Sequence, residues 1–124
     1  MEKQKTILIV DDDPLSLKTL ARILETNDYS VITAETGTDA IEIVNNSSPD
    51  LIILDYIMPD GDGVFVITML RSSLETFTLP VIFLTAYSSR KVREKAFNLS
   101  ATYVLEKPYD KKGLLQKVEE IIGR

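Results

Sequence analysis

This chain of 124 residues contains no cysteine, no histidine and no tryptophan. The absence of cysteine excludes a disulfide framework, a thiolate metal site and a cysteine nucleophile. The absence of histidine excludes Ser-His and Cys-His catalysis and histidine–metal sites. No GxGxxG or Walker pattern occurs, so the sequence gives no support to a nucleotide site. Carboxylate chemistry is left as the main option.

Long apolar runs are missing as well. No stretch approaches the roughly 20 residues of a membrane span, and the apolar run near the amino terminus is too short for a signal peptide. The net charge of −5 makes nucleic acid and anionic membranes poor partners. With 44% hydrophobic and 27% charged residues, the composition is that of an ordinary globular protein. We therefore expect one cytoplasmic domain over residues 1–124.

Two short apolar runs end in acidic residues. Ile7–Val10 is followed by three aspartates at 11–13, and the run at 51–54 is followed by Asp55. Short runs of branched aliphatic residues are typical of strands buried on both faces of a parallel sheet. Acids at the carboxyl ends of such strands meet in the crevice where open α/β sheets bind ligands. Because neighbouring carboxylates repel each other, the pattern predicts a site for a hard divalent cation of the magnesium type.

Strand and helix patterns alternate five times along the chain. The expected strands are Thr6–Val10, Ser30–Ala34, a stretch opened by Asp50 and ending near Asp55, Val81–Leu84 and Thr102–Leu105. This (βα)5 rhythm predicts right-handed crossovers and a doubly wound α/β fold with a five-stranded parallel sheet. With the flavodoxin-like strand order 2-1-3-4-5, strands one and three are neighbours and their acidic ends share one pocket.

A helix is expected after each strand. Asp13 is a favoured N-cap and Pro14 suits the first helical position. Apolar residues at helical spacing predict the inward faces, which are Leu17, Leu20, Ala21 and Leu24, then Ala40, Ile43 and Val44, then Val66, Met69 and Leu70, then Val92, Ala96 and Leu99, and finally Leu115, Val118 and Ile122. The fourth helix, near Ser89–Asn98, has the weakest apolar stripe, which favours loose packing.

Most of the candidate site residues also have a purely structural explanation. Asp13 is fully explained as an N-cap, and Asp55 taken alone is explained as a turn residue. A strand-end threonine such as Thr85 usually satisfies nearby backbone groups, and a lone lysine such as Lys107 is usually solvated. The doublet at 11–12 has no such explanation, because carboxylates buried at a strand end lose solvation unless a cation compensates.

Taken together, these residues resemble the receiver (response regulator) domain of two-component signalling. The matching stretches are Ile7-Leu8-Ile9-Val10-Asp11-Asp12-Asp13, Asp50-Leu51-Ile52-Ile53-Leu54-Asp55, Met58-Pro59, Asp62-Gly63, Leu84-Thr85-Ala86 and Lys107-Pro108. Each motif alone is weak, but their order at the ends of strands one, three, four and five is specific. The resemblance covers essentially the whole chain.

The resemblance implies a metal site and a phosphoacceptor. Asp55 is implied as the residue that becomes phosphorylated, and Asp11 and Asp12 as the acidic pair. Mg²⁺ is the implied cofactor, held by Asp12, Asp55 and the backbone carbonyl of Ile57, with Asp11 acting through water.

The resemblance also implies which groups bind the phosphoryl oxygens. Lys107 matches the phosphate-pairing lysine and Thr85 the switch hydroxyl, while the backbone amide of Ala86 takes a further oxygen. In this family the phosphoryl group comes from a phosphohistidine on a histidine kinase or a histidine phosphotransfer protein. The lack of histidine in this chain fits an acceptor rather than that donor.

The implied output is a change in shape of the face made by the fourth helix, fifth strand and fifth helix. A downstream protein or an output domain responds to this face, and many family members form homodimers through it. The family is regulatory rather than enzymatic, since it catalyses only its own phosphorylation and slow autodephosphorylation.

The sequence departs from the family pattern near the fifth strand. Receivers usually have an aromatic residue three positions before the lysine, and here that position is Val104. The aromatic Tyr103 is one residue earlier, so strand alternation points it to the opposite face. Tyr103 therefore remains a candidate switch residue in an unusual place. We hypothesise that Tyr87 takes part in the switch or covers the phosphate, and that with Ile57 it slows hydrolysis.

Two other functions fit parts of the sequence. A degenerate receiver would act as an interaction module without phosphorylation, but the intact set of acids, threonine and lysine argues against it. A haloacid dehalogenase-type aspartyl phosphatase also uses a strand-ending aspartate, but needs an acid two residues later, where this chain has Ile57, and a cap domain that this chain lacks. Turnover of a phosphate ester tests for the phosphatase, and magnesium-dependent phosphorylation separates the two kinds of receiver.

Overall fold

The predicted alternation of strands and helices is confirmed by the structure, a computed structural model that describes residues 4–58, 63–86 and 89–124. The strands are β1 (Thr6–Val10), β2 (Ser30–Ala34), β3 (Leu51–Asp55), β4 (Val81–Thr85) and β5 (Tyr103–Glu106). The helices are α1 (Pro14–Thr26), α2 (Gly37–Ser47), α3 (Gly63–Arg71), α4 (Arg90–Asn98) and α5 (Lys111–Ile122). None of the helices among the described residues is both long and apolar enough to cross a membrane.

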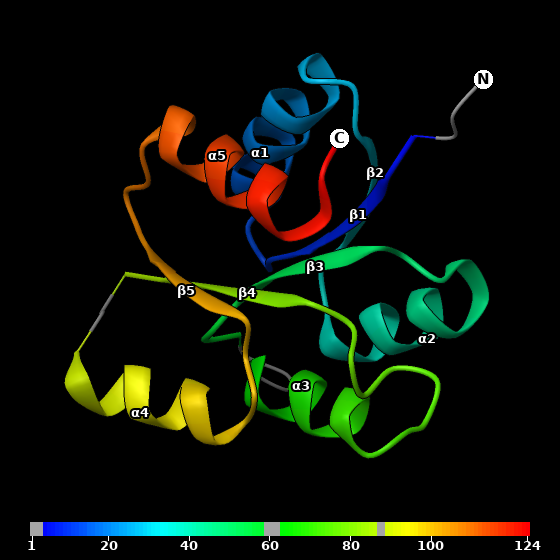
Figure 1. The fold of residues 1–124 in the computed structure, drawn as a ribbon, viewed down its shortest axis with the longest axis vertical. Helices are drawn as coiled ribbons and strands as arrows, with labels where there is room; N and C mark the ends of the chain where they lie inside the picture. Colours follow the sequence, from blue (N-terminus) through cyan, green and yellow to red (C-terminus); the bar gives the residue numbers. More distant parts are fainter. Residues whose placement is uncertain (1–3, 59–62, 87–88) are drawn as a thin grey trace.

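The five strands form one parallel sheet in the order β2-β1-β3-β4-β5, as predicted. Figure 1 shows α1 and α5 on one face of this sheet and α2, α3 and α4 on the other. β1 and β3 are neighbours although they are far apart in the sequence, with Val10 paired to Leu54 at their carboxyl ends. The chain therefore leaves both strands at the same edge of the sheet, which positions the residues that follow them side by side.

Alternate strand residues supply two separate hydrophobic cores, one on each face of the sheet. On β1, Leu8 and Val10 pack with the apolar residues of α2, α3 and α4. Ile7 and Ile9 pack with those of α1 and α5 on the other face. All four side chains are at most 1% exposed. The sheet is thus covered on both sides, and its edges and loops are what remain for function.

Side-chain caps explain where several helices begin. Asp13 caps α1 by accepting the backbone N–H of Leu15, with Pro14 in the first position, as predicted. Ser89 caps α4, and Asp110 caps α5. Ala96 is the only buried residue of α4, a helix that lies wholly within the described part of the chain. The predicted weak stripe of this helix is therefore confirmed.

One predicted inward position is wrong. Met69 is 45% exposed, and Ile67 is buried in its place beside Val66 and Leu70. α3 is apolar on nearly all sides, so its periodicity alone does not fix which side faces the sheet. On α5, the predicted Val118 is fully buried and the predicted Leu115 packs against the core, while Leu114 beside it is also fully buried.

The ends of β4 and β5 lie one residue later than predicted, at Thr85 and Glu106, and the starts of two strands also differ by one residue. β3 begins at Leu51, because the Asp50 carboxylate instead accepts the backbone N–H of Thr6 at 2.8 Å. β5 begins at Tyr103, and the side chain of Thr102 accepts the N–H of Val81 at 3.0 Å. In both cases a polar side chain closes the amino-terminal edge of the sheet, opposite the acidic edge.

Candidate functional site

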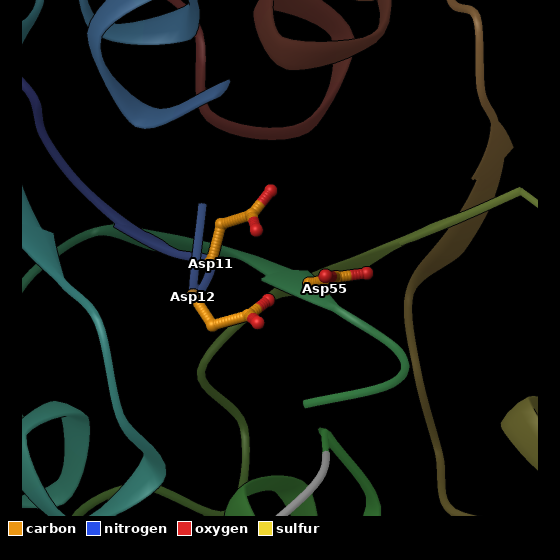
Figure 2. Close-up of side chains that lie close together, drawn as sticks. All are labelled: Asp11, Asp12 and Asp55. Carbon is orange, nitrogen blue, oxygen red and sulfur yellow. The ribbon is translucent and has the colours of Figure 1, made fainter. Parts of the chain in front are cut away.

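The carboxylates of Asp11, Asp12 and Asp55 converge at the carboxyl edge of the sheet (Figure 2). One oxygen from each lies within 4.8 Å of the others. Asp11 and Asp12 follow β1, and Asp55 is the last residue of β3, so the pairing of these two strands creates the cluster. The predicted meeting of acids from two strands is confirmed.

Buried polar side chains distinguish this edge of the sheet from the rest of the protein surface. Asp11 is 7% exposed and Thr85 is 2% exposed, and no other polar or charged residue in the described ranges is buried to this degree. Both residues lie at carboxyl ends of central strands, Asp11 after β1 and Thr85 at the end of β4. Because buried polar groups cost free energy unless they are paired, their concentration at one edge indicates a functional site.

The carboxylate of Asp11 is held by two hydrogen bonds. Its Oδ1 accepts the backbone N–H of Asp13 at 3.0 Å. Its Oδ2 accepts a hydrogen bond from Nζ of Lys107 at 3.2 Å. Both oxygens are therefore engaged by the protein, which fixes the carboxylate at the back of the cluster. Asp12, by contrast, is exposed and open to a ligand.

Lys107 brings a positive charge into the cluster from β5. Its Nζ lies 3.2 Å from Asp11 Oδ2 and 3.7 Å from Asp55 Oδ1. Its backbone N–H donates to the carbonyl of Thr85 at 2.8 Å, which ties the end of β5 to the end of β4. The bond to Pro108 is cis. One lysine thus faces both a buried carboxylate and the exposed edge.

The pKa of Asp55 is raised from 3.8 to about 6. Burial of the carboxyl group is the main cause, and the charges of Asp11 and Asp12 act in the same direction. The Lys107 ammonium and the backbone N–H of Ile57 oppose them by favouring the ionised form. Because ionisation of Asp55 costs free energy here, an added cation would stabilise the ionised carboxylate. This is the condition expected for a metal site.

Asp13 is close in sequence to the cluster but has a different role. Its side chain accepts the Leu15 N–H at 3.3 Å and the Ser16 hydroxyl at 2.7 Å. The hydrogen bond from Ser16 lowers the pKa of Asp13. The interpretation of Asp13 as a helix cap is confirmed.

The other predicted site residues lie at different distances from the cluster. Ile57 lies two residues after the end of β3, and its side chain is 61% exposed. Ala86 follows β4 and is exposed at the same edge. Tyr87 lies outside the described residues. Tyr103 lies at the opposite, amino-terminal end of β5, and its ring contacts Lys117 of α5, whose Nζ is 4.3 Å from the ring centre. The structure therefore does not bring Tyr103 to the carboxylates.

The expected reversal of Tyr103 and Val104 across the sheet is confirmed. Val104 packs into the core on the side of α4, whereas Tyr103 faces α5. The aromatic ring at position 103 therefore lies on the opposite face of the sheet from the side chain at position 104.

A cavity of about 690 Å³ opens beside the cluster, between α1 and the turn that leads into α5. Apolar residues of α1 and the ring of Tyr109 line most of it, and Asp11, Ala86 and Lys107 lie at its polar end. Clefts of this size that combine apolar walls with a few convergent polar groups are typical binding sites. The polar end of the cavity adjoins the edge where the carboxylates meet.

Comparison with known families identifies this arrangement. Residues 7–119 match the response regulator receiver domain family. The chain belongs to this family. As a receiver domain of the response regulator type it is a phosphoacceptor signalling domain, and the cluster of three aspartates is its acidic site.

Relatives support the same assignment for the receiver domain. The response regulator MprA of Mycobacterium leprae (strain TN) is 37% identical over 118 residues, which are 95% of this chain and 51% of that protein. MprA of Mycobacterium sp. (strain KMS) is 36% identical over 95% of this chain and 50% of its own length. The chain thus spans about half the length of these relatives.

Solved structures of receivers have the same fold. A putative response regulator from Chloroflexus aurantiacus J-10-fl superimposes with a TM-score of 0.93 at 32% identity, over 98% of this chain and all of that one. The chemotaxis protein CheY4 of Vibrio cholerae gives 0.92 at 25% identity, over 96% of this receiver and 99% of its own chain.

Proposed function

We propose that this receiver domain, taken over residues 1–124, accepts a phosphoryl group on Asp55 from a phosphohistidine of a histidine kinase or histidine phosphotransfer protein. The observation that supports this most is the position of Asp55. Its carboxylate ends the central strand, lies 3.7 Å from the Lys107 ammonium, and shares an edge with two further carboxylates. A nucleophile, a cation and ligands for a second cation therefore meet at one point.

In the proposed reaction, one oxygen of ionised Asp55 attacks phosphorus on the side opposite the imidazole. An O–P bond forms to give the acyl phosphate, and the P–N bond breaks with its electron pair returning to the imidazole nitrogen. The leaving imidazole is neutral, because it entered protonated on its other nitrogen. Such a transfer needs positioning and charge stabilisation rather than a separate acid–base catalyst.

The residues of the cluster fit Mg²⁺. Carboxylate oxygens of Asp12 and Asp55 and the backbone carbonyl of Ile57 are the hard oxygen ligands that this ion prefers, with water completing its shell. Asp11 is held by Lys107 and the Asp13 N–H, so its contact with the ion through water is consistent with its geometry. When bound, Mg²⁺ supplies positive charge to the transferring phosphoryl oxygens. The raised pKa of Asp55 supports this assignment, because the ammonium group of Lys107 balances the charge of one of the three carboxylates and leaves two uncompensated.

Lys107 and the end of β4 provide for the remaining phosphoryl oxygens in this proposal. Lys107 exchanges its contact with Asp55 for an ion pair with a phosphoryl oxygen, and its side chain is 28% exposed and able to turn outward. The Thr85 hydroxyl and the Ala86 N–H take another oxygen. Thr85 is tied to Lys107 through the hydrogen bond between their backbones, so the two respond together.

The signal leaves through the face made by α4, β5 and α5 in our proposal. α4 buries only Ala96 among its nine described residues, so moving it disturbs little of the core. Movement of Thr85 and Lys107 acts on the ends of β4 and β5, which lead into α4 and α5. A downstream protein, an output domain or a second copy of the chain then binds the altered face.

Intact mass after incubation with acetyl phosphate tests the proposal. We expect one phosphoryl adduct in the presence of Mg²⁺, and none with EDTA or in Asp55→Asn. Asp50→Asn is the matched control, because Asp50 lies next to the other end of β3 and contacts only the edge opposite the cluster. It should be labelled like the wild type. A folded protein that gains no phosphoryl group under any condition would instead be a degenerate receiver.

A further inference from the structure

Gly63 lies against the backbone of the proposed phosphoacceptor. It is the first residue of α3, and its N–H donates to the carbonyl of Tyr56 at 3.1 Å. A Cβ atom added at Gly63 would lie 2.6 Å from the Asp55 carbonyl oxygen, 2.8 Å from Cε1 of Phe83 and 3.2 Å from the Tyr56 Cα. Two of these distances are shorter than real Cβ contacts, so any side chain at this position must displace a neighbour.

None of these neighbours can move freely. The Asp55 carbonyl belongs to β3, where Asp55 is paired to Leu84 of β4, and the next residue, Tyr56, donates its N–H to the Leu84 carbonyl at 2.9 Å. Phe83 is completely buried and packs edge-to-face on Tyr56 with ring centres 5.3 Å apart. The strain of an added Cβ is therefore transmitted to the end of β3 or to the start of α3.

We propose that Gly63 is a positioning residue for phosphorylation, which sets the place of Asp55 relative to Asp12 and Lys107. This inference rests on the proposed function. The missing Cβ lets α3 start close against β3, where the Gly63 N–H donates to the carbonyl of Tyr56. A side chain at Gly63 shifts the acceptor carboxylate and the Ile57 carbonyl together, the two groups that we assign to the nucleophile and the metal.

The backbone conformation at Gly63 does not itself require glycine. Gly63 is helical, and among the described glycines only Gly123 has a positive φ. Alanine has a better helix propensity than glycine, although at Gly63, the first residue of α3, the gain is smaller than the roughly 1 kcal/mol of a helix interior. This gain offsets part of the packing strain in Gly63→Ala. We therefore expect phosphorylation to suffer more than folding, whereas a purely structural glycine would predict the opposite.

The test compares Gly63→Ala with Gly113→Ala. Gly113 lies in the first turn of α5, where an added Cβ meets only the side chain of Asp110, at 3.4 Å and beyond. For each variant we would measure the labelling rate against acetyl phosphate concentration, and the rise in melting temperature on adding Mg²⁺. We expect Gly63→Ala to lower the maximal rate about ten- to hundredfold, as ångström-scale misplacement does, and to reduce the Mg²⁺-induced rise. Gly113→Ala should match the wild type in both.

A second pair of variants keeps the test informative if Gly63→Ala does not fold. Phe83→Leu removes the ring contact and leaves room on that side, so Gly63→Ala/Phe83→Leu retains only the contacts with the backbone of Asp55 and Tyr56. We expect the double variant to be labelled at least threefold more slowly than Phe83→Leu alone. Equal rates in this pair, or a wild-type rate in Gly63→Ala, would overturn the role of Gly63. Absence of labelling in the wild type would instead overturn the proposed function.

Discussion

Replacing Asp55 by asparagine should stabilise the metal-free protein, and the gain should depend on pH. The pKa of Asp55 is 3.8 when unfolded and about 6 in the fold, chiefly because the carboxyl group is buried. Since a tenfold change in an ionisation equilibrium corresponds to about 1.4 kcal/mol, ionisation of Asp55 costs the folded state about 2–3 kcal/mol. Asparagine has similar size and no charge, so it avoids this cost.

The sign follows from the raised pKa. Below pH 3.8 Asp55 is protonated in both the folded and unfolded states, and its burial imposes no charge penalty. As the pH rises from 3.8 to about 6, the unfolded state loses the proton first, so the wild type loses stability relative to the variant. Above pH 6 the difference is complete. The advantage of Asp55→Asn therefore grows between pH 4 and 6 and is constant from there to pH 8.

Urea unfolding followed by circular dichroism in EDTA measures this directly. At pH 8 we expect Asp55→Asn to be about 2–3 kcal/mol more stable than the wild type, and at pH 4 nearly equal. Asp50→Asn removes the same charge outside the cluster and should show no such gain. Millimolar Mg²⁺ should narrow the difference by stabilising the wild type alone. A gain in stability of the same size at every pH, or no gain at pH 8, would show that ionisation of Asp55 does not destabilise the fold.

Three further predictions concern other parts of the receiver. Lys107→Met should slow labelling more than tenfold and lower stability in EDTA, since it leaves the acids without a counter-charge; Lys112→Met, at an exposed position, should do neither. Arg71→Leu should lower the free energy of unfolding by about 1.5–3 kcal/mol in urea titrations, because its guanidinium holds the Ser100 carbonyl at 3.0 Å. Tyr87→Ala should lose its phosphoryl group faster than the wild type in a time course of intact mass, and an unchanged rate would remove Tyr87 from the site.

The acidic cluster could be predicted from the sequence because it follows from strand order alone. Once β1 and β3 are neighbours in a parallel sheet, the residues after Val10 and at Asp55 must meet at one edge. The same logic places Thr85 and Lys107 at that edge, since Thr85 ends β4 and Lys107 directly follows β5. Periodicity and the topological rule therefore predicted the fold and the acidic cluster, whereas the roles of Thr85 and Lys107 came from the family resemblance.

Packing details could not be predicted in this way. The full burial of Leu114 beside the partly buried Leu115 depends on how α5 is rotated against the sheet. In the same way, the exposure of Met69 depends on which side of α3 faces the sheet. Gly63 was visible in the sequence as part of a motif, but its contact with the Asp55 backbone appears only as a distance. Local patterns specify which elements form, whereas such contacts depend on how the elements approach each other.

Asp55, and no other carboxylate of the cluster, should receive the phosphoryl group. Borohydride reduction of the labelled protein tests this, because it converts an aspartyl phosphate to homoserine, which peptide mass spectrometry then locates. We predict homoserine at position 55 in samples labelled with Mg²⁺ and nowhere in samples treated with EDTA. Homoserine at position 11 or 12, or a phosphoryl group that resists borohydride, would show that Asp55 is not the acceptor.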